Sequence, residues 1–373
     1  MFRSMKKKVL VIISNFQIGG IEKTLLQCLP FLKINGIQID ICCFDNSGPL
    51  LEAYEKYIGK IYKITKTHSI IFDAYQLNSI LTKEKYDIVH SRISFCSGGW
   101  CLICWLKRIP IIVSLHNVRE SLLLKNRTLI TSIIFNIYLL IHKFLAKSFA
   151  SHIIGHSKAI LNSYNKKWTK NKKYSVIYNG FHFKNDSLTE PDSFQFDYKF
   201  KYLLHIGSFR HQKNHKLLID VFENICKLQQ NVKLILLGEG IFKDEIIKTV
   251  KKKGLENDVY FLGTKNNIGF YYTHSDLFIF PSIHEGLGNV IIEAQYFELP
   301  IMASNIPPHL EVLSSLQYSH LFNLKTPPPK IAQLALDIIN SKKEYLSQSK
   351  EFVIKNFSIE RMVDNLRILY NSF

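Results

Sequence analysis

The most informative segment of this chain reads Phe280-Pro281-Ser282-Ile283-His284-Glu285-Gly286-Leu287-Gly288-Asn289-Val290-Ile291-Ile292-Glu293-Ala294-Gln295. It follows directly from an apolar run at 277–280 that is typical of a buried strand, and its second half is typical of a helix. Gly286 and Gly288 would let a ligand approach the backbone closely, and the start of the helix would offer unpaired N–H groups to an anion. The segment therefore predicts a strand, an anion-binding loop and a helix in succession.

Two carboxylates flank this predicted anion site, Glu285 before it and Glu293 inside the helix. If all eight intervening steps were helical, the two would lie about 12 Å apart along the axis. Glycosidase carboxylate pairs lie roughly 5 to 9.5 Å apart, so this spacing is wide for two groups that act on one bond. It suits a long ligand with a phosphate in the middle and hydroxyls at both ends, such as a nucleotide sugar. Taken alone, such a pair is more often structural, because carboxylates near a helix start complement its dipole.

The complete segment resembles the Glu-x7-Glu motif of the retaining glycosyltransferases of family 4, which have the GT-B fold. In that family the loop is typically Pro-Ser-x-x-Glu-Gly-Phe-Gly, and here Leu287 replaces the usual aromatic residue. The resemblance implies an α/β protein with two Rossmann-like domains that face a cleft. It also implies retention of anomeric configuration and no metal or other cofactor, and the chain lacks an Asp-x-Asp metal motif.

The N-terminal half alternates short β-branched runs with amphipathic runs. The expected elements are strands at 9–13, 37–44, 86–90 and 111–115 and a helix at about 22–32. This alternation predicts a mostly parallel sheet with helices on both faces. Ligands bind such sheets beyond the C-terminal ends of the strands, where Gly20 and His116 are expected.

Two short patterns at that edge strengthen the resemblance. Gly19-Gly20-Ile21-Glu22 resembles the family's Gly-Gly-x-Glu signature, whose glycine backbone faces the donor diphosphate or the acceptor. His116 matches a family position near the donor sugar. Alone, neither is specific: any tight turn can use two glycines, and a histidine at a strand end is more often satisfied by the backbone.

The C-terminal half begins a second alternation with a strand at 202–206 and a helix at 215–228. Between them, Gly207-Ser208-Phe209-Arg210-His211-Gln212-Lys213-Asn214 resembles the family's Gly-Arg-x-x-x-x-Lys-Asn pattern, whose Arg and Lys bind the donor phosphates. Lys213 fits the lysine position. Ser208 occupies the arginine position, so Arg210, two residues later, is the candidate substitute. Without this context Lys213 would be an ordinary surface lysine.

The resemblance thus implies a complete set of site residues. Those expected to act on the reacting groups are Glu285, His116, Lys213 and Arg210. Those expected to bind the nucleotide sugar are Gly20, Gly207, Arg210, Lys213, Gly286, Leu287, Gly288, Asn289, Val290 and Glu293. Glu293 is expected to bind the ribose hydroxyls and Glu285 the donor sugar.

Three domains or segments are expected. Residues 1–180 would form a basic, acceptor-binding Rossmann-like domain, 181–355 the nucleotide-sugar-binding domain, and 356–373 a C-terminal helix that crosses back to the first. The first boundary lies at Val176-Ile177-Tyr178-Asn179-Gly180, which resembles the family's Val-Ile-Pro-Asn-Gly-Val-Asp, with His182 in place of the aspartate. Residues 184–200 are expected to be a polar linker.

Charge is distributed unevenly between the two halves. Residues 1–180 contain 26 Lys and Arg against 9 Asp and Glu, a net of +17, whereas the other 193 residues contain 22 against 21, a net of +1. Such asymmetry indicates a polyanionic partner for the N-terminal half: a membrane surface, an anionic lipid or nucleic acid. No RNP-like, zinc-finger or recognition-helix pattern supports nucleic acid, so an anionic membrane surface is the predicted partner.

Residues 127–149 show a helical apolar stripe. A helix packed on the N-terminal sheet is the preferred interpretation and a membrane-surface helix the alternative. The apolar run at 129–145 is interrupted by Asn136, His142 and Lys143 and falls short of the roughly 20 residues that span a bilayer, so no transmembrane segment is expected. The basic run 166–173 suits anionic headgroups. Together with seven cysteines in no repeated framework, these features predict a cytoplasmic protein, peripheral on the inner face of the cytoplasmic membrane.

The predicted function is that of a retaining glycosyltransferase in bacterial surface polysaccharide biosynthesis, such as that of lipopolysaccharide or capsule. It would move a sugar from a nucleotide-diphosphate sugar, with UDP favoured on family frequency, to a polyprenyl-linked or other lipid-linked saccharide. The alternatives are a GT-B nucleotide-sugar epimerase that uses no acceptor, a catalytically silent scaffold that binds sugar or lipid beside another transferase, and a nucleic-acid-binding protein supported by charge alone.

Overall fold

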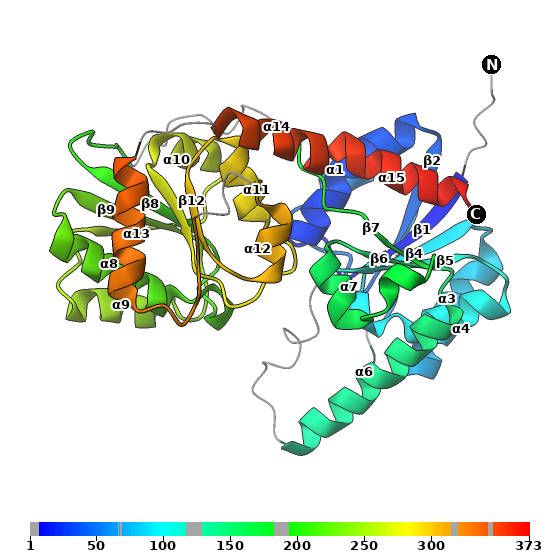
Figure 1. Cartoon of the computed structure of the whole chain (residues 1–373). Coiled ribbons are helices and arrows are strands. Elements are labelled where there is room, and N and C mark those ends of the chain that lie inside the picture. The colour runs from blue at the N-terminus through cyan, green and yellow to red at the C-terminus, as the bar shows by residue number, and fades with distance from the viewer. Residues whose placement is uncertain are drawn as a thin grey trace. The chain divides into compact units, whose positions relative to one another are not determined.

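The computed structural model describes residues 7–65, 67, 69–116, 129–182, 194–314, 320–341 and 346–373 of the chain. It divides into two compact units, of which unit 1 comprises residues 1–182 and 357–373 and unit 2 comprises residues 183–356. Each unit contains one parallel sheet with helices on both of its faces (Figure 1).

The sheet of unit 1 has seven strands in the order β3-β2-β1-β4-β5-β6-β7, all parallel. The strands are β1 Lys7–Ile13, β2 Ile37–Cys43, β3 Ile61–Lys63, β4 Ile88–Ser91, β5 Ile111–Leu115, β6 His152–Gly155 and β7 Tyr174–Val176. The order reverses between β1 and β4. In open parallel sheets this reversal marks the place beyond the strand ends where ligands bind.

The described helices of unit 1 connect these strands. They are α1 Gly20–Ile34, α2 Leu51–Glu55, α3 Ile70–Lys83, α4 Gly98–Leu106, α6 Leu129–Phe149, α7 Lys158–Tyr164 and α15 Ile359–Asn371, with single 3-10 turns η1 Ser94–Cys96 and η2 Trp168–Lys170. Along β1, Val9 and Val11 face the core beneath α1 and α15, and Leu10 faces the core beneath α3, α4 and α6. Burial on both faces explains why these strands are continuously apolar.

The C-terminal segment 357–373 belongs to unit 1 although unit 2 separates the two in the sequence. Helix α15 packs on α1, where the Sδ atom of Met362 lies 3.8 Å from the Sγ atom of Cys28. The phenol oxygen of Tyr370 lies 2.6 Å from Nδ1 of His90, which is buried in β4. The last helix therefore completes the core of the first unit.

Unit 2 contains a six-stranded parallel sheet in the order β10-β9-β8-β11-β12-β13. Its strands are β8 Lys201–Ile206, β9 Val232–Leu237, β10 Val259–Gly263, β11 Leu277–Phe280, β12 Ile301–Ser304 and β13 Leu321–Phe322. Its helices are η4 His211–Lys213, α8 His215–Leu228, α9 Lys243–Lys252, α10 Ile268–His274, α11 Asn289–Tyr296, α12 Pro307–Val312, α13 Pro328–Asn340 and α14 Leu346–Phe357, the last residue of which is assigned to unit 1.

The expected linker is only partly described, because residues 183–193 lie outside the described part of the chain. Residues 194–200 are irregular, as expected, but they are not a loose polar connection. The rings of Phe194 and Phe196 lie 5.1 Å apart, and Phe196 packs 4.6 Å from the ring of Tyr202 in β8. This aromatic segment therefore covers one edge of the unit 2 sheet.

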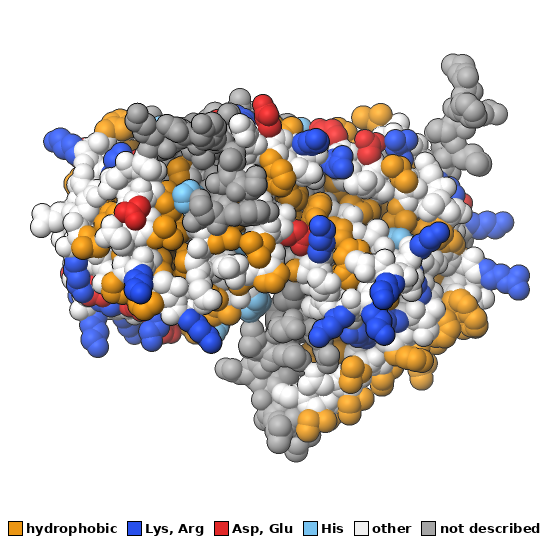
Figure 2. All heavy atoms as spheres, viewed as in Figure 1, with side chains coloured by type: hydrophobic (Ala, Val, Ile, Leu, Met, Phe, Trp, Pro, Cys, Tyr) orange, Lys and Arg blue, Asp and Glu red, His pale blue; other side chains and the backbone are white. Residues whose placement is uncertain are grey.

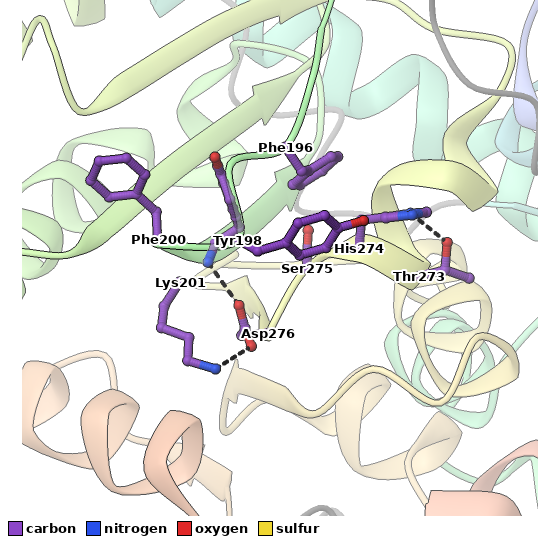
Figure 3. Close-up of a pocket in the computed structure, with 9 residues that line it drawn as sticks. Phe196, Tyr198, Phe200, Lys201, Thr273, His274, Ser275 and Asp276 are labelled. Atoms are coloured by element: carbon purple, nitrogen blue, oxygen red, sulfur yellow. Dashed lines mark hydrogen bonds and ion pairs between the residues drawn. The ribbon is translucent and has the colours of Figure 1, made fainter.

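A pocket opens beneath that segment at the N-terminal edge of the sheet (Figure 3). Phe196, Tyr198, Phe200 and Asp276 are among the residues that line it. Asp276 accepts from the backbone N–H of Tyr202 at 2.9 Å and from Nζ of Lys201 at 3.2 Å. The carboxylate thus ties the start of β8 to the start of β11, which indicates a structural role.

Helix α6 differs from its expected length. The helix continues past Leu145 to Phe149 and so reaches 21 residues, and Lys143 and Lys147 are the two charged side chains within it. Among the described residues it is the one helix that is long and apolar enough to cross a membrane by length and composition, and 17% of the relevant window, Thr131–Phe149, is buried. The expectation that this segment is too short to span is therefore wrong on length, whereas its packing on α4 agrees with the preferred interpretation of a packed helix.

Candidate functional site

Two loops meet at the C-terminal edge of the unit 2 sheet. Because β8 and β11 are neighbours in the sheet, the loop after β8, residues 207–214, lies beside the loop after β11, residues 281–288. The backbone N–H of Ile283 donates to the carbonyl of Gln212 at 2.9 Å and joins them. The parallel sheet thus brings together two motifs that are about seventy residues apart in the sequence.

An ion pair lies at this junction. Nζ of Lys213 is 2.7 Å from Oε1 of Glu285, and Nε2 of Gln212 donates to Oε2 of the same carboxylate at 3.2 Å. The Lys213 and Glu285 side chains are only 16% and 9% exposed. Nζ of Lys213 also lies 4.6 Å from the centre of the Phe280 ring, a cation–π contact. Since an ammonium group has three donors, the fixed lysine can also contact an anionic ligand.

Gly207 makes room for this lysine. A side chain at position 207 would place Cβ 3.2 Å from Cδ of Lys213 and 3.1 Å from Nε2 of His205, closer than ordinary contacts. Gly238, at the end of β9, has a φ of +140° and packs against the carbonyl of Gly207, where a Cβ would lie 2.3 Å from the oxygen. Position 238 therefore requires glycine, and a side chain at position 207 would displace Lys213 or His205.

The N-terminus of α11 is the second feature of the site. Gly288, the residue before the helix, adopts the left-handed conformation with φ +86° and ψ +50°, which glycine accepts without steric cost. Asn289 and Val290 form the first helical positions, and Leu287 is buried beneath the loop. The first N–H groups of a helix have no partner within the helix and carry its positive dipole end, so this geometry suits an anion.

Glu293 lies in α11, one turn after its start, and is held by a buried tyrosine. The phenol oxygen of Tyr272 lies 3.1 Å from Oε2 of Glu293 and 3.1 Å from the carbonyl of Val290. Burial, together with the Glu293 charge, raises the pKa of Tyr272 well above its usual value, so the phenol stays protonated and donates. Because residues 281–288 form a loop, Glu285 and Glu293 do not share one helix, and the helical spacing of about 12 Å does not apply to them.

Three buried histidines surround the pair, and the sequence did not single them out. His205, His215 and His309 are each at most 4% exposed, and Nε2 of each has no hydrogen-bond partner among the described residues. Burial lowers the pKa of His205 well below 6.5 and those of His215 and His309 to about 4, and the Lys213 charge acts in the same direction. The layer beneath Lys213 is thus neutral at pH 7. A histidine inside an otherwise apolar strand, as at position 205, is the sequence signal that could have revealed it.

A pocket adjoins this layer at the ends of β8, β9 and β10. It is lined by Ile206, Gly207, Ser208, Leu237, Gly238, Glu239, Thr264, Lys265 and Ile268. Its position at the C-terminal edge of a parallel sheet is the usual place for a ligand. The pocket therefore extends the site from Gly207 across the neighbouring strand ends.

Arg210 lies apart from these groups. Its side chain is exposed and lines a different pocket, together with residues of α8 and α9 that include His215 and Glu245. Lys213 does not line that pocket. The structure therefore unites Gly207, Lys213 and Glu285 but not the Arg210 side chain, whose predicted phosphate contact stays a prediction.

The two predicted residues of unit 1 lie at the C-terminal edge of its own sheet. Gly20 is the first residue of α1, and its carbonyl accepts from Oγ1 of Thr24 at 2.7 Å. His116 follows β5, is 8% exposed and stacks on His156 with ring centres 4.3 Å apart. Neither ring nitrogen of His116 has a partner among the described residues, and burial lowers its pKa well below 6.5. At neutral pH this imidazole can therefore donate one hydrogen bond and accept another.

The cysteines and possible metal ligands add little to the site. All seven cysteines are free, and burial raises the pKa of the Cys28 and Cys101 thiols to about 12. Within the described ranges, no three His, Cys, Asp or Glu side chains form a group that could hold a metal ion.

Comparison with solved structures identifies the fold. The chain superposes on Alr3699/HepE from Anabaena, solved in complex with UDP and glucose, with a TM-score of 0.77 and 17% identity, over 98% of this chain and 100% of that one. Two parallel-stranded α/β units of this kind define the GT-B fold, so the predicted fold class is confirmed.

The family follows from the sequence. A model described as Glycosyltransferase Family 4 matches residues 18–184, and a model described as Glycosyl transferases group 1 matches residues 186–358. Together the two models match nearly the whole chain, which therefore belongs to the GT-B glycosyltransferases with one domain of each description. The predicted enzyme class is thus also confirmed. Retention of configuration and the roles of individual residues stay predictions.

Two curated relatives illustrate the range of similarity. The capsular polysaccharide biosynthesis glycosyltransferase CapH of Staphylococcus aureus is 25% identical over 98% of this chain and 99% of its own length. The N-acetylgalactosamine-N,N'-diacetylbacillosaminyl-diphospho-undecaprenol 4-alpha-N-acetylgalactosaminyltransferase of Campylobacter jejuni is 35% identical, but over only 33% of this chain and 32% of its own length.

Proposed function

We propose that this protein transfers a sugar, with retention of configuration, from a UDP-sugar to a lipid-linked saccharide during surface polysaccharide biosynthesis. One observation carries the donor half of the proposal: Lys213 lies where two loops meet at one edge of the unit 2 sheet, and the second loop leads into the start of α11, the helix that carries Glu293. This set offers a cation and a dipole for a diphosphate and a carboxylate for sugar hydroxyls.

In this proposal the diphosphate is the leaving group. As its negative charge grows, the Lys213 ammonium and the N–H groups at the start of α11 stabilise it, and the loss of one such donor typically costs about 100- to 1,000-fold in rate. Fixed positive groups take the place of a divalent metal, which is why we propose that no metal is required. Glu285 orients Lys213 and contacts the donor sugar, and Glu293, held by Tyr272, binds the ribose. Arg210 is proposed as a further phosphate contact.

The family resemblance also gives two residues of unit 1 a role in the proposed reaction. The Gly20 backbone and the neutral His116 ring would contact the donor or the acceptor, and the acceptor hydroxyl would lose its proton to the departing phosphate. Retention rests on the family resemblance stated above, since no residue of the described chain fixes the stereochemical outcome by itself.

The names of similar proteins support the choice of substrates. Alr3699/HepE was solved with UDP, CapH is named for capsular polysaccharide, and the Campylobacter jejuni relative is named for a diphospho-undecaprenol acceptor. These properties belong to those proteins. They favour UDP over GDP and a lipid-linked acceptor over a free sugar for this chain.

We further propose that the protein acts in the cytoplasm at the inner face of the membrane. The net charge of +17 on residues 1–180 favours an anionic surface, to which each nearby basic residue contributes about 1 kcal/mol of attraction. Nucleic acid is not part of the proposal.

The first test is a thermal-shift screen of UDP- and GDP-sugars against the purified protein. A ligand at 100 times its Kd stabilises the native state by about 2.7 kcal/mol. We expect one UDP-sugar to raise the melting temperature, and Lys213→Ala and Glu293→Ala to abolish the shift. The matched controls are Lys227→Ala and Glu256→Ala, which remove the same charges at exposed positions of unit 2 away from the two loops.

A transfer assay with that UDP-sugar and polyprenyl-diphosphate saccharides then separates the alternatives. Transfer to the lipid supports the proposal. Release of free sugar or nucleotide without any acceptor would favour the epimerase instead. If no nucleotide sugar shifts the melting temperature while a lipid-linked saccharide does, the chain is the silent scaffold.

A further inference from the structure

Helix α6 presents an apolar face to the outside of unit 1. Six large side chains, each between 45% and 67% exposed, repeat at intervals of three and four residues and therefore share one face: Ile133, Ile134, Ile137, Leu140, Ile141 and Phe144. Figure 2 shows hydrophobic side chains in a line along this helix. An apolar strip of this length on the surface marks an interaction site.

The opposite face of α6 is anchored in unit 1. Leu139 and Ala146 are buried in the core beneath the sheet, and Nδ1 of His142 accepts from the backbone N–H of Gly98 in α4 at 2.9 Å. A Cβ atom at Gly98 would lie 2.7 Å from Cα of His142, so the two helices touch backbone to backbone. The helix therefore cannot turn its apolar face inward without breaking this contact.

The end of α4 extends the apolar strip. The ring of Trp105 lies 5.0 Å from the ring of Phe149, the last residue of α6, and Trp105 is 55% exposed. Leu106 beside it is 60% exposed. A partly exposed tryptophan at the end of an apolar strip is typical of the boundary between lipid and water.

Basic side chains border the strip. Between residues 88 and 182 the sequence has 14 Lys and Arg and one acidic residue, Glu120. Nζ of Lys143 lies 5.0 Å from the centre of the Tyr164 ring, which brings the end of α7 and the basic run that follows it beside α6. Lys147 of α6 is exposed. Four lysines of the basic run are exposed as well: Lys166, Lys167, Lys170 and Lys172.

We propose that the outer face of α6, with Trp105 and Leu106, lies flat in the surface of an anionic membrane. The apolar side chains would enter the boundary between headgroups and acyl chains, and the bordering lysines would contact anionic headgroups. This inference rests on the proposed function, in which the acceptor is lipid-linked, and identifies the surface by which the enzyme reaches it.

The same observations argue against two other occupants of this face. A second copy of the chain would bring two surfaces together that are almost free of acidic residues, and like charges repel. A spanning orientation would expose the polar contact of His142 and Gly98 to hydrocarbon and strip α6 from α4, which lipid cannot compensate. A helix lying in the membrane surface keeps the hydrogen bond between His142 and Gly98 and the packing of α6 on α4.

The test is flotation of the full-length protein with vesicles of phosphatidylcholine, with and without about one third phosphatidylglycerol. We expect strong binding to the anionic vesicles and weak binding to the neutral ones. The triple variant Ile137→Gln, Leu140→Gln, Phe144→Gln should lower the partition coefficient on the order of 100-fold, because three large apolar side chains are lost from the interface. The matched control, Ile34→Gln with Ile368→Gln, changes exposed apolar residues of α1 and α15 and should bind like the wild type.

Two further measurements make the result specific. Replacing the four exposed lysines of the 166–173 run with Gln should reduce binding to anionic vesicles about tenfold or more and leave binding to neutral vesicles unchanged. Brominated lipid should quench the fluorescence of Trp105, identified as the component that disappears in Trp105→Phe, whereas Trp100 is buried and should be shielded.

The outcomes separate this proposal from the proposed function. If the triple variant floats like the wild type, or Trp105 is not quenched, the proposal is overturned even when UDP-sugar binding is intact. A wild-type dimer that the triple variant converts to a monomer, without vesicle binding by either, would assign the face to self-association and also overturn it. Conversely, if the protein binds vesicles as expected but binds no nucleotide sugar, the membrane-binding proposal is supported and the proposed glycosyl transfer is contradicted.

Discussion

The ion pair between Lys213 and Glu285 links the stability of the two loops to the proposed function. Both side chains are at least 84% buried, so each charge is stabilised mainly by the other and not by water. Breaking a buried pair by removal of one partner typically costs about 3 to 5 kcal/mol, because the remaining charge has no solvent. Selection for nucleotide-sugar binding thus also selects for the stability of the two loops.

We expect a double-mutant cycle to measure this dependence. Lys213→Met should lower the free energy of unfolding by about 3 kcal/mol, and Lys213→Met with Glu285→Gln should cost at least about 1 kcal/mol less than the sum of the single variants. Urea denaturation provides the four values. The pair Arg367 and Asp364 on α15, whose side chains are 41% and 61% exposed, is the matched control and should couple by less than about 0.5 kcal/mol. Additive effects at Lys213 and Glu285 would contradict a buried, mutually dependent pair.

The buried histidines predict how stability depends on pH. For His309 and His215 the folded pKa is about 4, below the ordinary 6.5, so the unfolded chain binds more protons between these values. Their contribution to stability is complete above pH 6.5 and is lost as the pH falls toward 4, at up to about 1.4 kcal/mol per pH unit for each histidine.

The measurement is urea denaturation at several values between pH 7.5 and pH 5. Wild-type stability should fall with decreasing pH, and His309→Asn should reduce the slope because one titrating group is removed. An unchanged slope in the variant would mean that burial does not lower the pKa of His309 in the folded protein. His182, at an exposed position of unit 1, provides the control. If His182→Asn also reduced the dependence of stability on pH, the effect would not arise from burial.

At the scale of elements, the turn before α11 depends on one backbone conformation. Gly288 has a positive φ, and a Cβ there would lie 3.4 Å from His309, an ordinary contact, so Gly288→Ala is penalised by backbone strain and not by crowding. We expect a loss of about 1 to 2 kcal/mol in stability and at least tenfold weaker nucleotide-sugar binding, because the start of α11 shifts.

Gly254 supplies the matched control for this substitution. It has φ +68°, and no atom lies within 4 Å of its ideal Cβ, so Gly254→Ala imposes similar strain after α9. Its unfolding free energy should fall by a similar amount while nucleotide-sugar binding stays unchanged in a titration. Equal losses of binding in both variants would show that general destabilisation, and not the position of α11, is responsible.

Elements that form a clear apolar run or stripe could be predicted from the sequence, and the shortest strands could not. The expected bounds of β5, α8 and β11 agree with the structure to the residue, because each is a clear apolar run or stripe between turn residues. Strands β3 and β13 have only three and two residues, which are too few to show the alternation of apolar and polar residues that identifies a strand. Their positions follow from pairing with longer neighbours, which is tertiary information.

The candidate site was predictable where local sequence determines it. The Gly207, Lys213, Glu285 and Gly288 positions follow from motifs, and the adjacency of β8 and β11 brings them together. The histidine layer was not predictable, since nothing in the order of the chain indicates that His205 and His309 both pack against the ring of Phe280. Likewise nothing in the sequence indicates that Arg210 lines a pocket with residues of α8 and α9 and not the site of Lys213.

At the scale of the whole molecule, the chain leaves unit 1, forms unit 2 and then returns. The returning helix α15 buries five side chains in the core of unit 1: Ile359, Met362, Val363, Leu366 and Tyr370. This core also contains residues of β1 and α1. Unit 1 is therefore assembled from both ends of the sequence.

We expect α15 to be essential for the stability of unit 1. Leu366 is 1% exposed, so Leu366→Ala should cost about 2 to 5 kcal/mol, whereas Ile368→Ala, two residues later and 63% exposed, should change stability by less than about 1 kcal/mol. Thermal unfolding of the two variants checks this contrast. Equal effects would contradict the packing of α15 on α1.

The return of the chain also sets the order of events during protein synthesis. Residues 183–373 follow the first part of unit 1, and at about 5 to 20 residues per second their translation takes roughly 10 to 40 s. Throughout that interval the nascent N-terminal part lacks α15 and keeps one face of its sheet open, while unit 2 is continuous in the sequence and can fold as soon as it emerges. The second unit to be synthesised is thus the first that can be completed on the ribosome, and the first unit closes only with the last residues of the chain.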